Sequence, residues 1–281
     1  GDLVAAADLL SQATELAPAF ASAWFTLGEI REQLGEHDAA VTAFLEAKDA
    51  DPDDLHGASL RLMLLGTEKL SAMPPAYVRA LFDQYAPKFE AALVGELGYR
   101  GPTLLFKAVL AAQQAVHKPA LFKRAIDLGC GTGLAASVFA RKVDHFTGID
   151  LSPRMIERAR ATGHYAQLEV AEMVEGLKNK PDASAEFVLA ADAIVYLSDL
   201  APLLREVARV LVAGGLLAFT VETHDGNDVI LGKGLRYAHG IVYVRTSIRD
   251  AGLVLLQLEG LSSRNEDSTP VPGLVVVAAK I

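Results

Sequence analysis

Cysteine is almost missing from this chain: among its 281 residues, Cys130 is the only one. An intrachain disulfide is therefore impossible, which fits a reducing compartment, and we expect a cytoplasmic protein. Without a group of Cys and His residues at metal-site spacing, we expect no bound metal. No apolar stretch reaches the roughly 18 residues of a membrane-spanning helix, and we expect no membrane partner.

Basic residues are also in the minority. The chain has 26 Lys and Arg against 35 Asp and Glu, which gives a net charge of -9. Because nucleic-acid binding rests mainly on the neutralisation of phosphates, we expect no nucleic-acid partner. Hydrophobic residues make up 51% of the chain, enough for a large core in one or two domains.

What the chain does have, near its start, is an internal repeat. Pro18 and Pro52 lie 34 positions apart, and so do Ala13 and Ala47. Periods of 20 to 50 residues are typical of stacked helical repeats. The sequence therefore predicts pairs of packed helices in this part of the chain.

The segment from Ala21 to Asp54 resembles a tetratricopeptide repeat. Trp24, Leu27 and Gly28 follow the pattern of its first helix, and Phe44 lies on the second. The resemblance implies one complete repeat, the second helix of an earlier one and the first helix of a later one near residues 55–66. We place this segment at residues 1–72, either as a groove that binds a protein partner or as a helical cap.

Residues 73–122 are expected to form a helical linker or lid. Pro74 and Pro75 break one helix and begin another, which we extend over residues 77–97, and a second helix follows over residues 103–116. Aromatic residues at helical spacing usually belong to a core. Tyr85 and Arg100 are nevertheless candidates for contact with a cofactor or substrate.

From residue 123 to the C-terminus, short apolar runs alternate with amphipathic stretches. This alternation predicts an α/β fold with a mostly parallel sheet and helices on both faces. In such sheets ligands bind at the carboxyl ends of the strands, where the strand order reverses.

A glycine-rich loop follows the first predicted strand. Gly129, Gly131 and Gly133 allow a tight turn and close approach of a ligand, and Asp127 precedes them. A dinucleotide-binding fingerprint needs its third glycine at position 134, which is Leu134. The spacing therefore argues against a nicotinamide-dependent oxidoreductase.

The run from Asp127 to Gly133 resembles the first motif of class I (Rossmann-like) S-adenosylmethionine-dependent methyltransferases. The resemblance implies a seven-stranded sheet and S-adenosylmethionine as cofactor. It implies that Gly129, Cys130, Gly131 and Gly133 lie under the methionine part of the cofactor. Asp127 would reach toward the amino group, and we assign Cys130 no redox role.

The ends of the next two predicted strands extend this resemblance. Asp150 follows Gly129 by 21 positions, where a carboxylate can accept the ribose hydroxyls, and Leu151 would contact adenine. The alternative role for Asp150, a helix N-cap, suits Ser152 better. Glu172 and Met173 match the family positions that face the adenine amine and flank the ring, although the common Gly-Asp pair is absent.

A narrower resemblance covers both parts of the chain. Joined to the repeats, the domain is similar to bacterial predicted methyltransferases that carry tetratricopeptide repeats. The matching pieces are residues 82–86, 97–102, 190–192 and 236–240, with Gly240 a departure from the Ser of that group. This group implies no particular acceptor.

The acceptor side offers several polar candidates. Asp192 would lie at the rim where the methyl group is passed, and we expect it to contact the cofactor as well. His239 is a candidate base near neutral pH, so Asp192 and His239 are our catalytic candidates. Tyr237 or Tyr243 would hold an acceptor. A lone loop histidine is more often structural, and methyl transfer needs a base only when the acceptor keeps its proton until attack.

The sequence thus predicts transfer of a methyl group from S-adenosylmethionine to a small-molecule acceptor. The enzyme would act mainly by positioning the two substrates for in-line displacement. Two alternatives stay open: a protein methyltransferase whose repeats hold the substrate protein, and a scaffold that only senses the cofactor.

Overall fold

The computed structural model describes residues 1–87, 98–266 and 268–281. It divides into two compact units: Gly1–Ala80 with Leu231–Leu235, and Leu81–Ile230 with Arg236–Ile281. The domain boundaries that we expect after residues 72 and 122 stay a prediction. Phe89 and Leu97, which the expected helix over residues 77–97 includes, lie outside the described residues.

The first unit consists of antiparallel helices, as the repeat period predicts. Its elements are α1 (Leu3–Leu16), α2 (Ala21–Gln33), α3 (His37–Ala50) and α4 (Ala58–Leu64), and α5 (Pro75–Tyr85) begins there. Helices α2 and α3 approach closely because Gly28 faces the Phe44 ring, where a Cβ would lie 2.6 Å from Phe44 Cε1. The Trp24 indole donates a hydrogen bond to the Pro18 carbonyl oxygen at 2.9 Å.

The second unit is built on one twisted sheet with the strand order β3-β2-β1-β4-β5-β11-β8. All neighbours on this path pair in parallel except β11, which runs antiparallel to both β5 and β8. The strands are β1 (Phe122–Leu128), β2 (Val143–Asp150), β3 (Tyr165–Val170), β4 (Ala185–Ala190), β5 (Leu211–Glu222), β8 (Leu253–Gly260) and β11 (Gly273–Lys280). The short strand β7 (Tyr237–His239) pairs with β5, and β6 (Val229–Leu231) pairs with β7. Strand β9 (Asn265–Glu266) pairs with β10 (Thr269–Pro270). The predicted fold class is confirmed.

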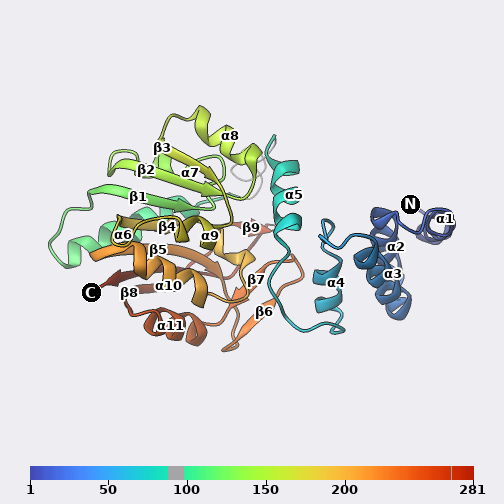
Figure 1. Ribbon diagram of the computed structural model, residues 1–281. Coiled ribbons are helices and arrows are strands. Elements are labelled where there is room, and N and C mark those ends of the chain that lie inside the picture. The colour runs from blue at the N-terminus through green and yellow to red at the C-terminus, as the bar shows by residue number, and fades with distance from the viewer. Residues whose placement is uncertain (88–97, 267) are drawn as a thin grey trace. The chain divides into compact units, whose positions relative to one another are not determined.

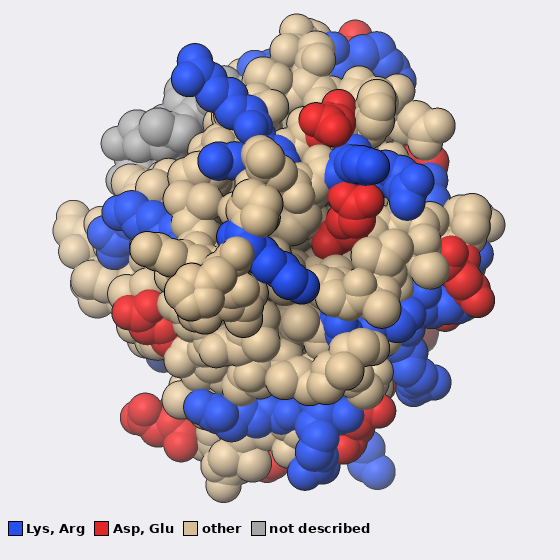
Figure 2. Space-filling view, turned by 90° about the vertical axis from the view of Figure 1, so that its left-hand side faces the viewer, with Lys and Arg blue, Asp and Glu red and all other residues tan. Residues whose placement is uncertain are grey.

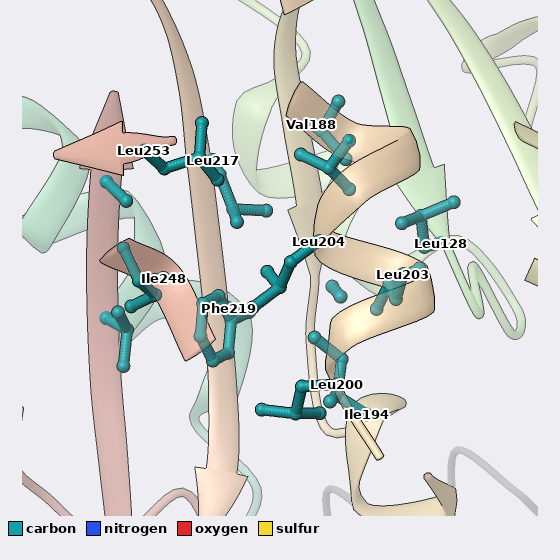
Figure 3. Packing of buried hydrophobic residues seen from close by; sticks show 14 of the residues in the cluster. Leu128, Val188, Ile194, Leu200, Leu203, Leu204, Leu217, Phe219, Ile248 and Leu253 are labelled. Carbon is teal, nitrogen blue, oxygen red and sulfur yellow. The ribbon is translucent and has the colours of Figure 1, made fainter. Parts of the chain in front are cut away.

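Helices cover both faces of this sheet (Figure 1). They are α6 (Gly101–Ala115), α7 (Leu134–Phe139), α8 (Pro153–Ala161), α9 (Met173–Lys178), α10 (Ala201–Val210) and α11 (Ile241–Asp250), and a 3₁₀ turn, η2, spans Ile194–Tyr196. Alternate residues of β4 separate the two cores: Val188 packs with α10 and α11, whereas Phe187 packs with α6 and α7. Figure 3 shows the first core, in which Leu204 of α10 points toward Phe219 of the sheet.

Because the five consecutive strands β3, β2, β1, β4 and β5 run parallel to one another, their carboxyl ends meet at one edge. β1 ends before the glycine loop, β2 ends at Asp150, and β4 leads into Asp192. The opposite face, at the amino ends of these strands, carries Lys and Arg in several groups with Asp and Glu among them (Figure 2). The carboxyl edge is therefore the place where the predicted site residues gather.

Candidate functional site

The glycine loop between β1 and α7 depends on glycine at each of its three positions. The φ angles of Gly129, Gly131 and Gly133 are 63°, 54° and 95°, in the left-handed region that other residues rarely adopt. A Cβ on Gly129 would lie 2.3 Å from the Cβ of Ala193. The loop therefore passes directly against the segment that follows β4, and a side chain at position 129 does not fit.

Asp150, at the end of β2, ties this loop to the sheet. Its Oδ2 accepts a hydrogen bond from the Gly131 amide at 2.8 Å, and its Oδ1 accepts one from the Ser152 amide at 2.8 Å. Burial raises the pKa of Asp150, and the two amide hydrogen bonds oppose that rise. The N-cap of α8 is Ser152, whose Oγ accepts from the Met155 amide at 3.1 Å, so Asp150 is not needed for capping.

Asp127 lies beneath the loop with only 1% of its surface exposed. The Tyr165 hydroxyl donates a hydrogen bond to Asp127 Oδ2 at 2.7 Å. Burial raises the pKa of Asp127 to about 7; the Tyr165 hydrogen bond lowers it, and the charge of Asp150 raises it further. Near neutral pH this carboxyl therefore exists in both protonation states.

The loop has the features of a ligand cradle. Thr132 is buried, and its Oγ1 has no hydrogen-bond partner among the described residues, although buried hydroxyls normally have one. Cys130 is buried next to it, and desolvation raises the pKa of its thiol well above the usual value. A neutral thiol, three glycines and an unpartnered hydroxyl fit a polar ligand that approaches the backbone closely.

The end of β3 places Glu172 and Met173 at the start of α9. Glu172 caps this helix: its Oε2 accepts from the amides of Val174 at 2.9 Å and Glu175 at 3.0 Å. Met173 is partly buried against the core. Leu151, after β2, is also partly buried. Contacts of these three residues with adenine stay a prediction.

Asp192 is held rigidly at the carboxyl end of β4. Its φ is 53°, and its carboxylate accepts hydrogen bonds from the Thr220 hydroxyl at 2.6 Å and the Ser263 hydroxyl at 2.7 Å. Arg264 Nη1 lies 3.3 Å from Asp192 Oδ2. A carboxylate with three fixed donors stays in one orientation, which suits a group that positions an acceptor.

Arg264 connects Asp192 to a cluster of charged side chains. Only 5% of Arg264 is exposed, and it also pairs with Glu222 and Glu266. Arg236 bonds the same two glutamates, with its Nε 2.6 Å from Glu222 Oε1. The late polar residues that are scattered in the sequence therefore form one ion-paired group beside β5.

Tyr99 also lies near the carboxyl edge of the sheet, although the sequence gives no reason to choose it as a site residue. Its hydroxyl is packed against α6, where a Cβ on Gly101 would lie 2.7 Å from the phenol oxygen. Burial raises the pKa of Tyr99, and the charges of Asp192 and Asp127 raise it further. The phenol is thus a neutral group that can form hydrogen bonds, and it lies within the electrostatic influence of both Asp127 and Asp192.

Arg100, the other candidate of the linker, anchors the same turn. Its amide donates to the Ser263 carbonyl oxygen at 2.8 Å, and its Nε donates to the Ser262 carbonyl oxygen at 2.8 Å. These bonds connect the start of α6 to the segment after β8. Contact of Arg100 with a cofactor or substrate stays a prediction, and its observed partners are structural.

His239, the candidate base, is fully buried at the end of β7. Its Nε2 lies 2.9 Å from the Leu197 carbonyl oxygen, which only accepts, so Nε2 carries the proton. Nδ1 is buried without a partner among the described residues. Burial lowers the pKa of His239 to about 4, so the ring is neutral at pH 7, and it stacks on Tyr243 with ring centroids 5.8 Å apart.

The end of α5 lies over the start of α8. Ser152 Oγ donates to Asp83 Oδ1 at 2.6 Å, and the Phe82 ring meets Tyr196 edge-on at 5.3 Å. Tyr85, one turn beyond Phe82, is 52% exposed. The position of α5 fits the predicted lid, and contact of Tyr85 with a cofactor stays a prediction.

Within residues 1–87, 98–266 and 268–281, no helix is both long enough and apolar enough to cross a membrane. The same residues contain no cluster of three or more His, Cys, Asp or Glu side chains arranged to hold a metal ion.

Comparison with protein families matches both parts of the chain. Residues 126–219 match the model of a methyltransferase domain, and residues 1–64 match a tetratricopeptide repeat model. The predictions of a methyltransferase domain and of tetratricopeptide repeats are therefore confirmed. The first match spans β1 to β5 and includes the glycine loop, Asp150 and Asp192.

Curated relatives share only part of their length with this chain. Methyltransferase-like protein 27 of Homo sapiens is 30% identical over 175 residues, which cover 61% of this chain and 66% of that protein. The 27-O-demethylrifamycin SV methyltransferase of Amycolatopsis mediterranei (strain S699) is 35% identical over 160 residues, 52% of this chain and 59% of that protein. The chain thus covers less than two thirds of either relative.

A solved structure supports the fold. The 1,6-didemethyltoxoflavin-N1-methyltransferase of Burkholderia thailandensis, solved with 1,6-didemethyltoxoflavin and S-adenosylhomocysteine, has a TM-score of 0.55. The likeness covers 76% of this chain and 92% of that one at 16% identity. At this identity the likeness establishes the Rossmann-like methyltransferase fold and nothing finer.

Proposed function

Because this chain carries a Rossmann-like methyltransferase domain behind tetratricopeptide repeats, we propose that it transfers a methyl group from S-adenosylmethionine to a small-molecule acceptor. The observation that carries the proposal is the arrangement at the carboxyl ends of the neighbouring strands β1 and β2. There the left-handed glycine loop, Asp127 beneath it and Asp150 at its side occur together within a matched methyltransferase domain.

The residues present fit the cofactor. Gly129, Gly131 and Gly133 leave room for its methionine part, and Thr132 Oγ1 is a buried hydroxyl without a partner among the described residues. Each oxygen of Asp150 accepts one amide and keeps a second lone pair for a ribose hydroxyl. When bound, S-adenosylmethionine supplies an electrophilic methyl group on a sulfonium.

On the acceptor side, the protein's work is orientation. Asp192, fixed by Thr220, Ser263 and Arg264, presents a carboxylate that does not need to reorganise when an acceptor arrives. His239 is a weaker candidate for a base, since its ring is buried and its pKa is lowered to about 4. We therefore propose Asp192 as the residue that orients the acceptor.

A small-molecule acceptor is favoured by the relatives. The Amycolatopsis and Burkholderia enzymes are named for acceptors of low molecular mass. Methylation of a partner protein held by the repeats is the second candidate, because residues 1–64 match a tetratricopeptide model. A cofactor-sensing scaffold is the third, and it differs from both in lacking transfer.

Cofactor binding is tested by calorimetry of the full chain with S-adenosylhomocysteine. Asp150→Ala removes the acceptor of two amide bonds, and we expect about 10- to 100-fold weaker binding. Asp144→Ala is the matched control, since Asp144 is exposed on the same strand, β2, far from its carboxyl end. Absence of binding by the unchanged chain would contradict the proposal.

Transfer is tested with S-adenosylmethionine that carries a labelled methyl group. The protein is incubated with a cell extract that has been separated into a low-mass and a protein fraction. Label in the low-mass fraction, lost in Asp192→Ala, supports the proposal. Label only in proteins favours the second candidate, and cofactor binding without transfer in either fraction favours the scaffold.

A further inference from the structure

Tyr165 is the first residue of β3, yet its side chain reaches the carboxyl end of β1. It does so by crossing β2 at Gly148, where a Cβ would lie 2.9 Å from Tyr165 Cε1. Only glycine at position 148 leaves this path open. The ring also meets Phe146 of β2, with ring centroids 5.9 Å apart.

On its other edge, the Tyr165 ring supports the glycine loop. A Cβ on Gly133 would lie 3.1 Å from Tyr165 Cε2, so the ring lies directly beside the last glycine, and it packs against the cluster that contains Cys130. Beyond the ring, the hydroxyl donates to Asp127 Oδ2 at 2.7 Å. One side chain therefore contacts the loop, the middle strand and the buried carboxyl together.

We propose that Tyr165 is a positioning residue for the cofactor: its ring supports the glycine loop across Gly148, and its hydroxyl holds the Asp127 carboxylate toward the cofactor's amine. This inference rests on the proposed function, because it takes S-adenosylmethionine as the ligand of the loop. Neither the methyltransferase match nor the resemblance to the family assigns a role to this tyrosine.

The hydroxyl has a second consequence, which makes the role measurable. A hydrogen bond to the ionised carboxylate favours that form, so Tyr165 lowers the pKa of Asp127 against the effect of burial. The other titratable groups around Asp127 are Asp150 on β2, Cys130 in the loop and Tyr99 before α6. Of these, Asp150 raises the Asp127 pKa, and the two others are neutral near pH 7.

The sign of the pH effect follows from the charge of the ligand. The amine of S-adenosylhomocysteine is cationic near neutral pH, so it binds better when Asp127 is ionised. The affinity of the unchanged protein should fall as the pH falls through the Asp127 pKa of about 7. Without the Tyr165 hydroxyl that midpoint moves to higher pH, by up to about one unit for one hydrogen bond.

The experiment measures the dissociation constant of S-adenosylhomocysteine by calorimetry between pH 5.5 and 8.5. We expect Tyr165→Phe to bind slightly more weakly at the alkaline end, where Asp127 is ionised but no longer held by the hydroxyl. Near pH 7 it should bind much more weakly, with a higher midpoint. Tyr165→Leu, which also loses the ring, should bind more weakly throughout, and Asp127→Asn should lose the midpoint near pH 7. The matched control is Tyr77→Phe, which removes a tyrosine hydroxyl from the first compact unit and leaves the residues of the glycine loop unchanged.

A midpoint shared by Tyr165→Phe and the unchanged chain would overturn the proposal. A second readout needs no ligand: the infrared band of the Asp127 carboxyl, identified by its loss in Asp127→Asn, should titrate at higher pH in Tyr165→Phe. If the band shifts but the unchanged chain binds no S-adenosylhomocysteine, the proposed function fails and only the hydrogen bond to Asp127 stands. If the chain binds but neither midpoint moves, Tyr165 is a packing residue only.

Discussion

At the scale of single residues, Asp127 places an ionisable group where water does not reach. Its pKa rises from 3.8 to about 7 in the folded protein, chiefly through burial. The folded state therefore holds a proton on this carboxyl between about pH 4 and pH 7, while the unfolded chain has released it. Folding stability consequently falls as the pH rises through that window, and above pH 7 the loss is complete.

Asp127→Asn removes this dependence, because the amide does not titrate. We expect the unliganded variant to be more stable than the unchanged chain at pH 8, by up to about 4 kcal/mol, and to lose the advantage toward pH 4. Urea denaturation at pH 4.5, 6 and 8 measures the difference. An equal difference at all three values would show that Asp127 does not titrate in this window.

The residues of the loop were predictable because their chemistry is contiguous. Gly129, Gly131 and Gly133 stand within five positions, and the left-handed φ of each is a local requirement. Tyr165 was not predictable, since it lies 38 positions from Asp127 and meets it only by crossing Gly148. Nothing in the local sequence of β3 separates this tyrosine from an ordinary strand residue.

At the scale of elements, the end of α5 is tied to the cofactor edge by a chain of hydrogen bonds. Asp83 accepts from Ser152, whose amide donates to Asp150, which in turn accepts from Gly131. Arg154 adds a bond from its Nη1 to the Asp83 carbonyl oxygen at 3.2 Å. Because α5 is connected in this way to Asp150, the residue proposed to bind the ribose, it can slow the dissociation of a cofactor.

We therefore expect Asp83→Ala to raise the dissociation rate of S-adenosylhomocysteine by about 3- to 10-fold, with a smaller change in the association rate. Stopped-flow displacement on the full chain measures it. Asp83→Asn keeps an oxygen that accepts from Ser152 and should restore most of the slow release. Equal dissociation rates for Asp83→Ala and the unchanged chain would mean that α5 does not retain the cofactor.

The elements were predicted better than their ends. The alternation of apolar runs predicts the strands β1 to β5 and the helices α7, α8 and α10. It does not predict α9, α11, β8 and β11 individually. Strands β6 and β7 lie within residues 222–240, a stretch whose glycine and aspartate residues favour a loop. These strands have three residues each, and they form only because β7 pairs with β5 and β6 pairs with β7. Strands this short have no periodic pattern in the sequence that would predict them.

At the scale of the whole molecule, the chain forms two compact units of different construction. The period of the repeats indicates the first, and the alternation of strands and helices indicates the second. The first unit also includes Leu231–Leu235, which come late in the chain. This was not predictable, because it depends on tertiary contacts between segments that are far apart in the sequence. A ligand held by the glycine loop contacts residues of the second unit, so its stabilising effect is expected there first.

The only tryptophan of the chain, Trp24, lies in the first unit and reports on it alone. At a concentration of about 100 times its dissociation constant, S-adenosylhomocysteine should stabilise the second unit by about 2.7 kcal/mol. This raises the midpoint temperature of its unfolding by roughly 5 to 10 °C. Thermal unfolding followed by Trp24 fluorescence should keep its midpoint, while the calorimetric transition of the second unit moves. If both midpoints rise equally, the two units unfold as one, and the repeats are then a structural part of the enzyme that binding at the loop stabilises.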